Sequence, residues 1–172
     1  MAYIPQLDLN AATEEQRAAY DAEIALRGRM TNMKRTLAHS PEALRIYGEW
    51  FTLRDQLQPA IGDRAIFTLC LAISKAMDNR VGMGFMRRGL ASLGAEDGNQ
   101  PGIDLLDIET FGRAIATDAK SIPPALWARL GAQLSPKTLV DLTALAGIMI
   151  ATNGFMSAVG TEVDQELAQF ID

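Results

Sequence analysis

Apolar side chains recur along much of the chain at intervals of three or four residues, the spacing that gathers side chains on one face of an α-helix. A first such face is predicted between residues 43 and 57, formed by Ala43, Ile46, Trp50, Leu53 and Leu57. Pro59 and Gly62 follow, and both residue types interrupt helices. The pattern therefore predicts a helix over this segment that ends before Gly62.

A second apolar face is expected from a helix that begins near Asp63. Its members are Ile66, Leu69, Cys70, Ile73 and Met77. The polar pair Asp78-Asn79 predicts a break, after which a helix resumes through Met83 to Leu93. Asn79 is a suitable residue to cap the start of that helix.

Several helix starts carry recognisable caps. Thr13 with Gln16 has the spacing of a capping box before a helix over 17–27, and Ser40-Pro41 and Ser135-Pro136 place a cap beside a first-turn proline. Short helices are also expected from Leu106 to Asp118 and from Pro123-Pro124 to Leu130. The helix after Ser135 is the most apolar of all.

No segment alternates apolar and polar residues as a half-buried strand does, so the expected class is all-α. Residues 94–102 hold three glycines and a proline, which predicts a loop between two helical halves. A chain of 172 residues suits a single domain, and we expect it to cover residues 1–172.

The net charge of -5 argues against nucleic acid as a partner, because phosphate backbones are bound by basic stripes. Arg80, Arg87 and Arg88 gather only three positive charges across nine positions. Residues 139–160 are apolar but include Asp141 and several hydroxyl and amide side chains. We expect this segment to be a core or interface helix rather than a membrane span.

Cys70 is the only cysteine and His39 the only histidine. One cysteine can neither close an internal disulfide nor complete a thiolate metal site, and one histidine excludes the usual zinc and di-iron ligand sets. Cys70 is expected to be a buried, unreactive thiol and His39 a local hydrogen-bonding residue beside a helix cap. No signal peptide is visible at Met1, so we expect a cytoplasmic protein. We expect it to hold neither a metal nor a cofactor.

Three further groups allow a structural or a functional interpretation. Gly82-Met83-Gly84 with Gly89 favours close helix packing over phosphate binding, and the helix start at Asn79 with Arg80 could attract an anion. The acidic group Asp104, Asp107 and Glu109 suits a helix N-terminus better than a general acid. The methionine group Met77, Met83 and Met86 fills a core or lines an apolar pocket.

Three stretches of the chain together resemble a known superfamily. The first stretch is Thr36 to Leu44, followed by Trp50-Phe51. The second begins with Asp63-Arg64, includes Leu69 to Ala72, and continues to Arg87 to Leu90 and Gly94. The third is Leu134 to Leu142, followed by 153–156 and 159–162. In order and spacing they resemble the carboxymuconolactone decarboxylase and AhpD-like alkylhydroperoxidase superfamily over about residues 30–165. The resemblance implies an AhpD-like helical domain, a homo-oligomer and, by family label, peroxiredoxin activity.

The resemblance also locates the reactive region of the family in this chain. Redox members carry C-x-x-C, then a histidine, with a glutamate on the preceding helix. Aligned through Gly94, these fall on Asn79, Gly82, Met86 and Phe67, and a register shifted by two residues brings in Met77, Arg80 and Gly84 instead. None of these side chains can replace a thiolate, so no catalytic residue is carried over.

Three functions remain compatible with the sequence. The preferred one is a degenerate member that binds a small, partly apolar ligand near the break at Asp78-Asn79, through Phe67, Met77, Asn79, Arg80, Gly82, Met83 and Met86. The second is a non-redox lyase or isomerase that works through Arg80, Arg87 or an acidic side chain. The third is a structural subunit of a homo- or hetero-oligomer, paired with an active paralogue.

Overall fold

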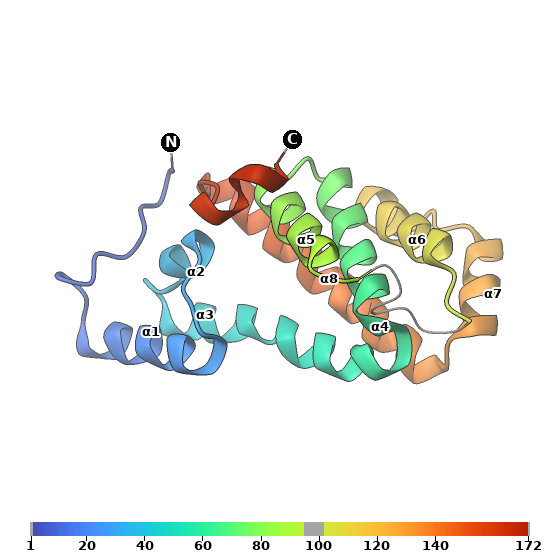
Figure 1. Cartoon of the computed structure of the whole chain (residues 1–172), viewed down its shortest axis with the longest axis horizontal. Helices are drawn as coiled ribbons and strands as arrows, with labels where there is room; N and C mark the ends of the chain where they lie inside the picture. Colours follow the sequence, from blue (N-terminus) through green and yellow to red (C-terminus); the bar gives the residue numbers. More distant parts are fainter. Residues whose placement is uncertain (1, 95–101, 172) are drawn as a thin grey trace.

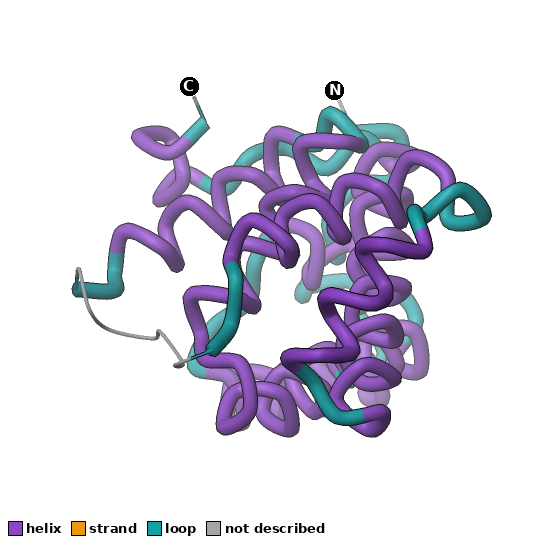
Figure 2. Tube along the Cα trace, turned by 90° about the vertical axis from the view of Figure 1, so that its right-hand side faces the viewer, coloured by secondary structure: helices purple, strands orange, loops and turns teal. Residues whose placement is uncertain are grey.

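The computed structural model describes residues 2–94 and 102–171, and every regular element in those ranges is a helix (Figures 1 and 2). In chain order the elements are α1 Glu14–Arg27, α2 Asn32–Leu37, α3 Pro41–Gly48, α4 Trp50–Ala76, α5 Arg80–Ala91, α6 Leu105–Asp118, α7 Pro124–Gln133, α8 Pro136–Val159 and the 3-10 helix η1 Gln165–Phe170. The predicted all-α class is therefore confirmed for the described residues.

Capping side chains fix the starts of the N-terminal helices. Thr13 and Gln16 form the predicted capping box, each side chain accepting a hydrogen bond from the other residue's backbone N–H. Ser40 caps α3 as predicted, and Thr31 caps α2 by accepting from the N–H of Lys34. These helices form the blue and cyan part of Figure 1, beside the larger helical body.

α4 carries the chain from the N-terminal helices into the core through a kink at Gly62. This residue has φ 78° and ψ 158°, a conformation that a residue with a Cβ adopts only under strain. Pro59, which lacks a backbone N–H, lies in the turn before it. In Figure 1 the first half of α4 follows the lower edge of the molecule and the second half turns upward beside α5. The predicted interruption is confirmed.

The second half of α4 is the central helix of the core and packs against α5, α6 and α8. Ile66, Leu69 and Ile73, three members of the predicted apolar face, are completely buried there. Phe111 of α6 and Leu145 of α8 are equally buried and belong to the same cluster. The second predicted face is thus the face around which the body of the protein is built.

The prediction of one continuous helical face over 43–57 was wrong. α3 ends at Gly48, Glu49 forms a turn, and α4 begins at Trp50. Ile46 consequently lies on the outside, with 51% of its surface exposed. The six-residue elements α2 and η1 were not predicted, because so short a segment shows less than two turns of any pattern. Most of the predicted loop, residues 95–101, lies outside the described residues.

α8 is the most apolar helix and buries only one side. Leu142, Leu145 and Met156 face the core, whereas Val140 and Ala151 are exposed. Its length and composition would suffice for a membrane span, and 39% of its most apolar window is buried. Core helices of soluble proteins have the same length and composition. The expected burial in the core is confirmed for one face.

Candidate functional site

A cavity of about 600 Å³ lies between the N-terminal helices and the body of the protein. α2, α3 and the first turns of α4 supply one wall, and the second half of α4, α5 and α8 supply the other. The kink at Gly62 makes this possible, because it lets one helix contribute to both walls. The volume lies in the range of small-molecule sites.

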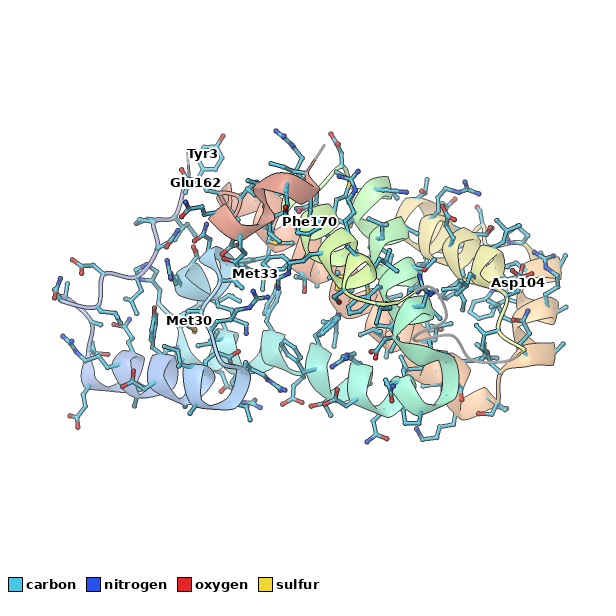
Figure 3. All side chains as sticks on the ribbon, in the orientation of Figure 1. Tyr3, Met30, Met33, Asp104, Glu162 and Phe170 are labelled. Carbon is cyan, nitrogen blue, oxygen red and sulfur yellow. The ribbon has the colours of Figure 1, made fainter. Side chains whose placement is uncertain are left out.

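Aromatic and aliphatic side chains make up most of the cavity wall. The aromatic members are Tyr47, Trp50, Phe51, Phe67 and Phe85. Methionines and leucines fill the spaces between them: Met33, Leu37, Leu44, Met86, Met149 and Met156. Met33 belongs to α2 and is labelled in Figure 3. Such a wall suits a molecule that offers mainly apolar surface, and the methionines can adapt to its shape.

Phe67, Gly82 and Met86, three of the seven residues expected near a ligand, lie in the cavity wall. Gly82, Met86 and Gly89 follow each other at intervals of four and three, so that one face of α5 carries all of them. Three of the predicted residues thus lie in the cavity wall, two of them on this face of α5.

Met77, Asn79, Arg80 and Met83 lie outside the cavity wall. Met77 ends α4 and packs against the core, and Arg80 is exposed. Met83 follows Gly82 by one residue, and this step of about 100° around the helix turns it away from the cavity. The expectation that the whole segment 77–86 faces a ligand was too broad, because only one helical face can do so.

Asn79 is a buried structural residue. Its Oδ1 accepts the N–H of Gly82 at 2.8 Å, which confirms the predicted cap of α5. Its Nδ2 donates to the carbonyl of Asn153 at 3.1 Å and to Ser157 Oγ at 3.0 Å, both on α8. The side chain that could have oriented an anion at this helix start thus joins α5 to α8 instead.

The glycines of α5 allow very close helix packing. A Cβ at Gly82 would lie 2.4 Å from Asn153 Oδ1 and 2.6 Å from Ser74 Oγ, and one at Gly89 would lie 2.8 Å from the Phe67 ring. These distances are shorter than real Cβ contacts. The structure therefore favours the packing interpretation of Gly82 and Gly89 over phosphate binding.

Three solved structures share this arrangement of helices. An alanine-for-cysteine variant of the debrominase Bmp8 in complex with 2,3,4-tribromopyrrole matches with a TM-score of 0.79 at 12% identity, covering 100% of this chain and 97% of that one. The apo form of Bmp8 matches with a TM-score of 0.77 at 13% identity, covering 98% and 96%. The alkylhydroperoxidase AhpD core protein from Ralstonia eutropha JMP134, described as an uncharacterized peroxidase-related protein, matches with a TM-score of 0.67 at 14% identity, covering 96% and 94%.

The chain has the AhpD-like fold. The resemblance seen in three stretches of sequence is thereby confirmed at the level of fold. No protein-family model and no curated protein matches the sequence.

The positions that the sequence resemblance assigns to the redox residues of the family can be compared with the cavity wall. Of the four positions onto which the resemblance places the family's redox residues, Phe67, Gly82 and Met86 line the cavity and Asn79 lies directly behind it, bonded to Gly82. A phenyl ring, a hydrogen and a thioether stand at the three positions in the wall. Phe67 and Met86 therefore offer apolar contact at positions to which the resemblance assigns redox residues.

Cys70, the single thiol of this AhpD-like chain, is fully buried and lies outside the cavity wall. Burial raises its pKa to about 12, and a contact with the Trp50 side chain offsets part of that rise. At neutral pH the side chain is a protonated thiol, and a protonated thiol is a poor nucleophile. The expectation of a buried Cys70 is confirmed.

His39 and the acidic group have local structural contacts. His39 Nε2 lies 3.0 Å from the carbonyl of Pro5. Asp104 caps α6, and buried Asp107 accepts hydrogen bonds from Arg129 and Gln133 of α7 at 2.8 and 2.9 Å. These contacts favour the structural interpretation of both groups.

The residues named for a lyase or isomerase do not converge on the cavity. Arg80 is exposed, and Arg87 donates to the carbonyl of Phe170 at 2.9 Å, which holds η1. Burial raises the pKa of Asp164, but this carboxylate accepts the N–H of Asn32 at 2.8 Å at the start of α2. Within residues 2–94 and 102–171 no carboxylate lines the cavity.

Sequence reasoning missed the wall contributed by the N-terminal helices. Arg27, Arg29 and Lys34 line the cavity, and with Arg35 they place four positive charges within nine positions. This cluster is denser than the one formed by Arg80, Arg87 and Arg88. The charge count could have found it, whereas the approach of residues 27–34 to α5 depends on tertiary structure.

Proposed function

We propose that this AhpD-like chain binds a small, largely apolar molecule in the cavity and does not carry out thiol redox chemistry. The observation that carries the proposal is the cavity itself, about 600 Å³ in volume and walled mainly by aromatic and aliphatic side chains. It includes three of the four positions to which the resemblance assigns the reactive residues of the family. Folds often keep a binding location when the chemistry differs.

The complex of the Bmp8 variant supports this proposal by example. That protein shares the fold and holds 2,3,4-tribromopyrrole, a small aromatic ring. At 12% identity the likeness extends only to the fold. It is nevertheless consistent with an AhpD-like chain that accommodates a ring of this size.

We propose no thiol chemistry because Cys70 is the only cysteine in the sequence. A peroxidase cycle through a dithiol needs an attacking thiolate and a resolving thiol. Cys70 has a pKa of about 12 and no exposed surface. The family label of peroxiredoxin activity is therefore not part of the proposed function.

The proposal is tested with N-phenyl-1-naphthylamine, an uncharged aromatic probe whose fluorescence rises in apolar surroundings. Gly48 lies in the cavity wall, and a Cβ there would meet no atom within 4 Å, so Gly48→Phe is designed to narrow the cavity. We expect saturable binding of the probe and at least about tenfold weaker binding to this variant.

Gly131→Phe is the matched control. Gly131 lies on α7, outside the cavity wall, and a Cβ there also meets nothing within 4 Å. The control variant should bind the probe as the wild type does. Equal loss of binding in both variants, or no saturable binding to the wild type, contradicts the proposal.

A further inference from the structure

Cationic side chains surround the apolar cavity. Arg27 and Arg29 approach it from the end of α1, Lys34 from α2, Arg54 from α4 and Arg88 from α5. No carboxylate among residues 2–94 and 102–171 joins them in the wall. This surplus is local, since the whole chain carries a net charge of -5.

Two of these cations are neutralised by carboxylates that lie behind the wall. Lys34 Nζ lies 2.5 Å from Glu23 Oε1, and Arg54 Nη2 lies 2.7 Å from Asp63 Oδ1. Their side chains are from 10% to 30% exposed, so these pairs are partly shielded from solvent. They stabilise the wall and contribute little net charge to the cavity.

Two of the other three cations share one carboxylate. Arg29 and Arg88 both approach the same oxygen of Glu166, Oε1, at 2.6 and 3.2 Å. Arg27 has no carboxylate partner among the described residues, and its buried Nε has no hydrogen-bond acceptor. The surplus of positive charge therefore lies in the part of the cavity wall that Arg27, Arg29 and Arg88 form.

Two aromatic rings of the wall hold these cations in place. The Arg27 guanidinium lies 4.1 Å from the centre of the Phe51 ring, and Arg29 and Arg88 lie 5.6 and 5.5 Å from the centre of Phe85. Stacking of this kind orients a guanidinium but accepts no hydrogen bond in its plane. The N–H groups of Arg27 thus remain able to bind an oxygen anion.

From this arrangement we infer that the ligand is a planar aromatic acid, with its ring against the apolar wall and its carboxylate or phenolate oxygen bound by Arg27. The inference rests on the proposed function and names the class of ligand for the same cavity. Arg88 and Arg29 share the single carboxylate of Glu166, so their remaining positive charge adds long-range attraction for the anionic group of the ligand. An uncharged amide of the same shape would offer the N–H groups of Arg27 only a neutral carbonyl oxygen, which is a weaker acceptor than a carboxylate.

The test compares 2-naphthoate with 2-naphthamide at pH 7, each as a competitor of N-phenyl-1-naphthylamine. The two competitors share their ring and differ in charge. We expect 2-naphthoate to displace the probe at about tenfold lower concentration or less, the effect of one good charge-assisted hydrogen bond. Added salt should reduce the advantage.

Variants locate the effect. Arg27→Met replaces the guanidinium over Phe51 with an uncharged side chain of similar length and should remove most of the preference for 2-naphthoate, while Arg27→Lys should retain most of it. Arg113→Met removes one positive charge from an exposed position of α6 and should change nothing. Binding of the probe to each variant shows that its cavity is intact.

The outcomes separate the two claims. Equal displacement by the acid and the amide, or a preference as large in Arg27→Met as in the wild type, overturns the inference. The proposed function still stands in that case, provided that the probe binds. Failure of the wild type to bind the probe, the acid or the amide overturns both.

Discussion

Replacing Gly82 with alanine inserts a methyl group at the closest contact between α5, α4 and α8. The new Cβ would lie 2.4 Å from Asn153 Oδ1 and 2.6 Å from Ser74 Oγ, and ordinary contact begins at 3.4 Å. Relief therefore requires a movement of about 1 Å. Neither neighbour turns away freely, because Asn153 Nδ2 donates to the Met149 carbonyl at 2.7 Å and Ser74 Oγ donates to the Cys70 carbonyl at 2.9 Å.

The expected cost follows from two opposing effects. Overpacking a well-filled core costs about 1–3 kcal/mol. Alanine regains up to about 1 kcal/mol, because it is the better helix former. We expect Gly82→Ala to lower the free energy of unfolding by about 1–2 kcal/mol, and the melting temperature by roughly 2–4 °C for each kcal/mol.

Gly131→Ala separates the two effects. Gly131 lies in α7, where a Cβ meets no atom within 4 Å, so this variant gains helix propensity without overpacking. Both variants are measured by equilibrium denaturation in urea, with the slopes compared to exclude a change in the unfolded state. If Gly82→Ala is as stable as Gly131→Ala, α5 does not pack against Asn153 and Ser74 as described.

Three further predictions concern the thiol, the assembly and the cap. The raised pKa of Cys70 leaves its thiolate unpopulated until the pH approaches 12, so Cys70 should resist Ellman's reagent at pH 8 until the protein is unfolded. For the same reason, lipoyl- or thioredoxin-coupled reduction of an organic hydroperoxide should be absent. Turnover that disappears in Cys70→Ser would refute this prediction. The exposed apolar face of α8 predicts that the protein is a homo-oligomer, which light scattering would detect. Ala151→Glu should shift the assembly toward the 18.7 kDa monomer. A wild-type protein that is monomeric at micromolar concentration would contradict this prediction. Asn79→Ala should lower the free energy of unfolding by about 1–3 kcal/mol in the same urea assay, because it removes the cap of α5 and the hydrogen bonds to α8. An unchanged midpoint of urea denaturation would exclude this structural role of Asn79.

The sequence predicted most of the helices, because their signals are local. Capping residues such as Thr13, Ser40 and Ser135 act within one turn, and the apolar face of Ile66, Leu69 and Ile73 is visible from spacing alone. The kink at Gly62 was also indicated by residue type. α2 escaped prediction because its six residues show less than two turns of a pattern, and one of its first N–H groups, that of Asn32, is bonded by the distant Asp164.

The candidate site was only half predictable. The resemblance led to α5, and helical geometry then decides that Gly82 and Met86 face the cavity while Arg80 and Met83 do not. The other wall comes from residues 27–54, which lie well before α5 in the chain. Nothing in the local pattern around Arg27 shows that it stacks on Phe51 or that it faces Met86 across a cavity.

The two tryptophans of the chain offer a direct test of the binding cavity. Trp50 lies in the cavity wall, whereas Trp127 lies on α7, where it packs against Phe111. In a ¹H–¹⁵N spectrum each gives one indole N–H signal, assigned by substitution with phenylalanine. On titration with N-phenyl-1-naphthylamine, a small apolar ligand bound in the cavity should move the Trp50 signal in a saturable way and leave Trp127 unchanged. A saturable shift of Trp127 with a stationary Trp50 would contradict the proposed binding site.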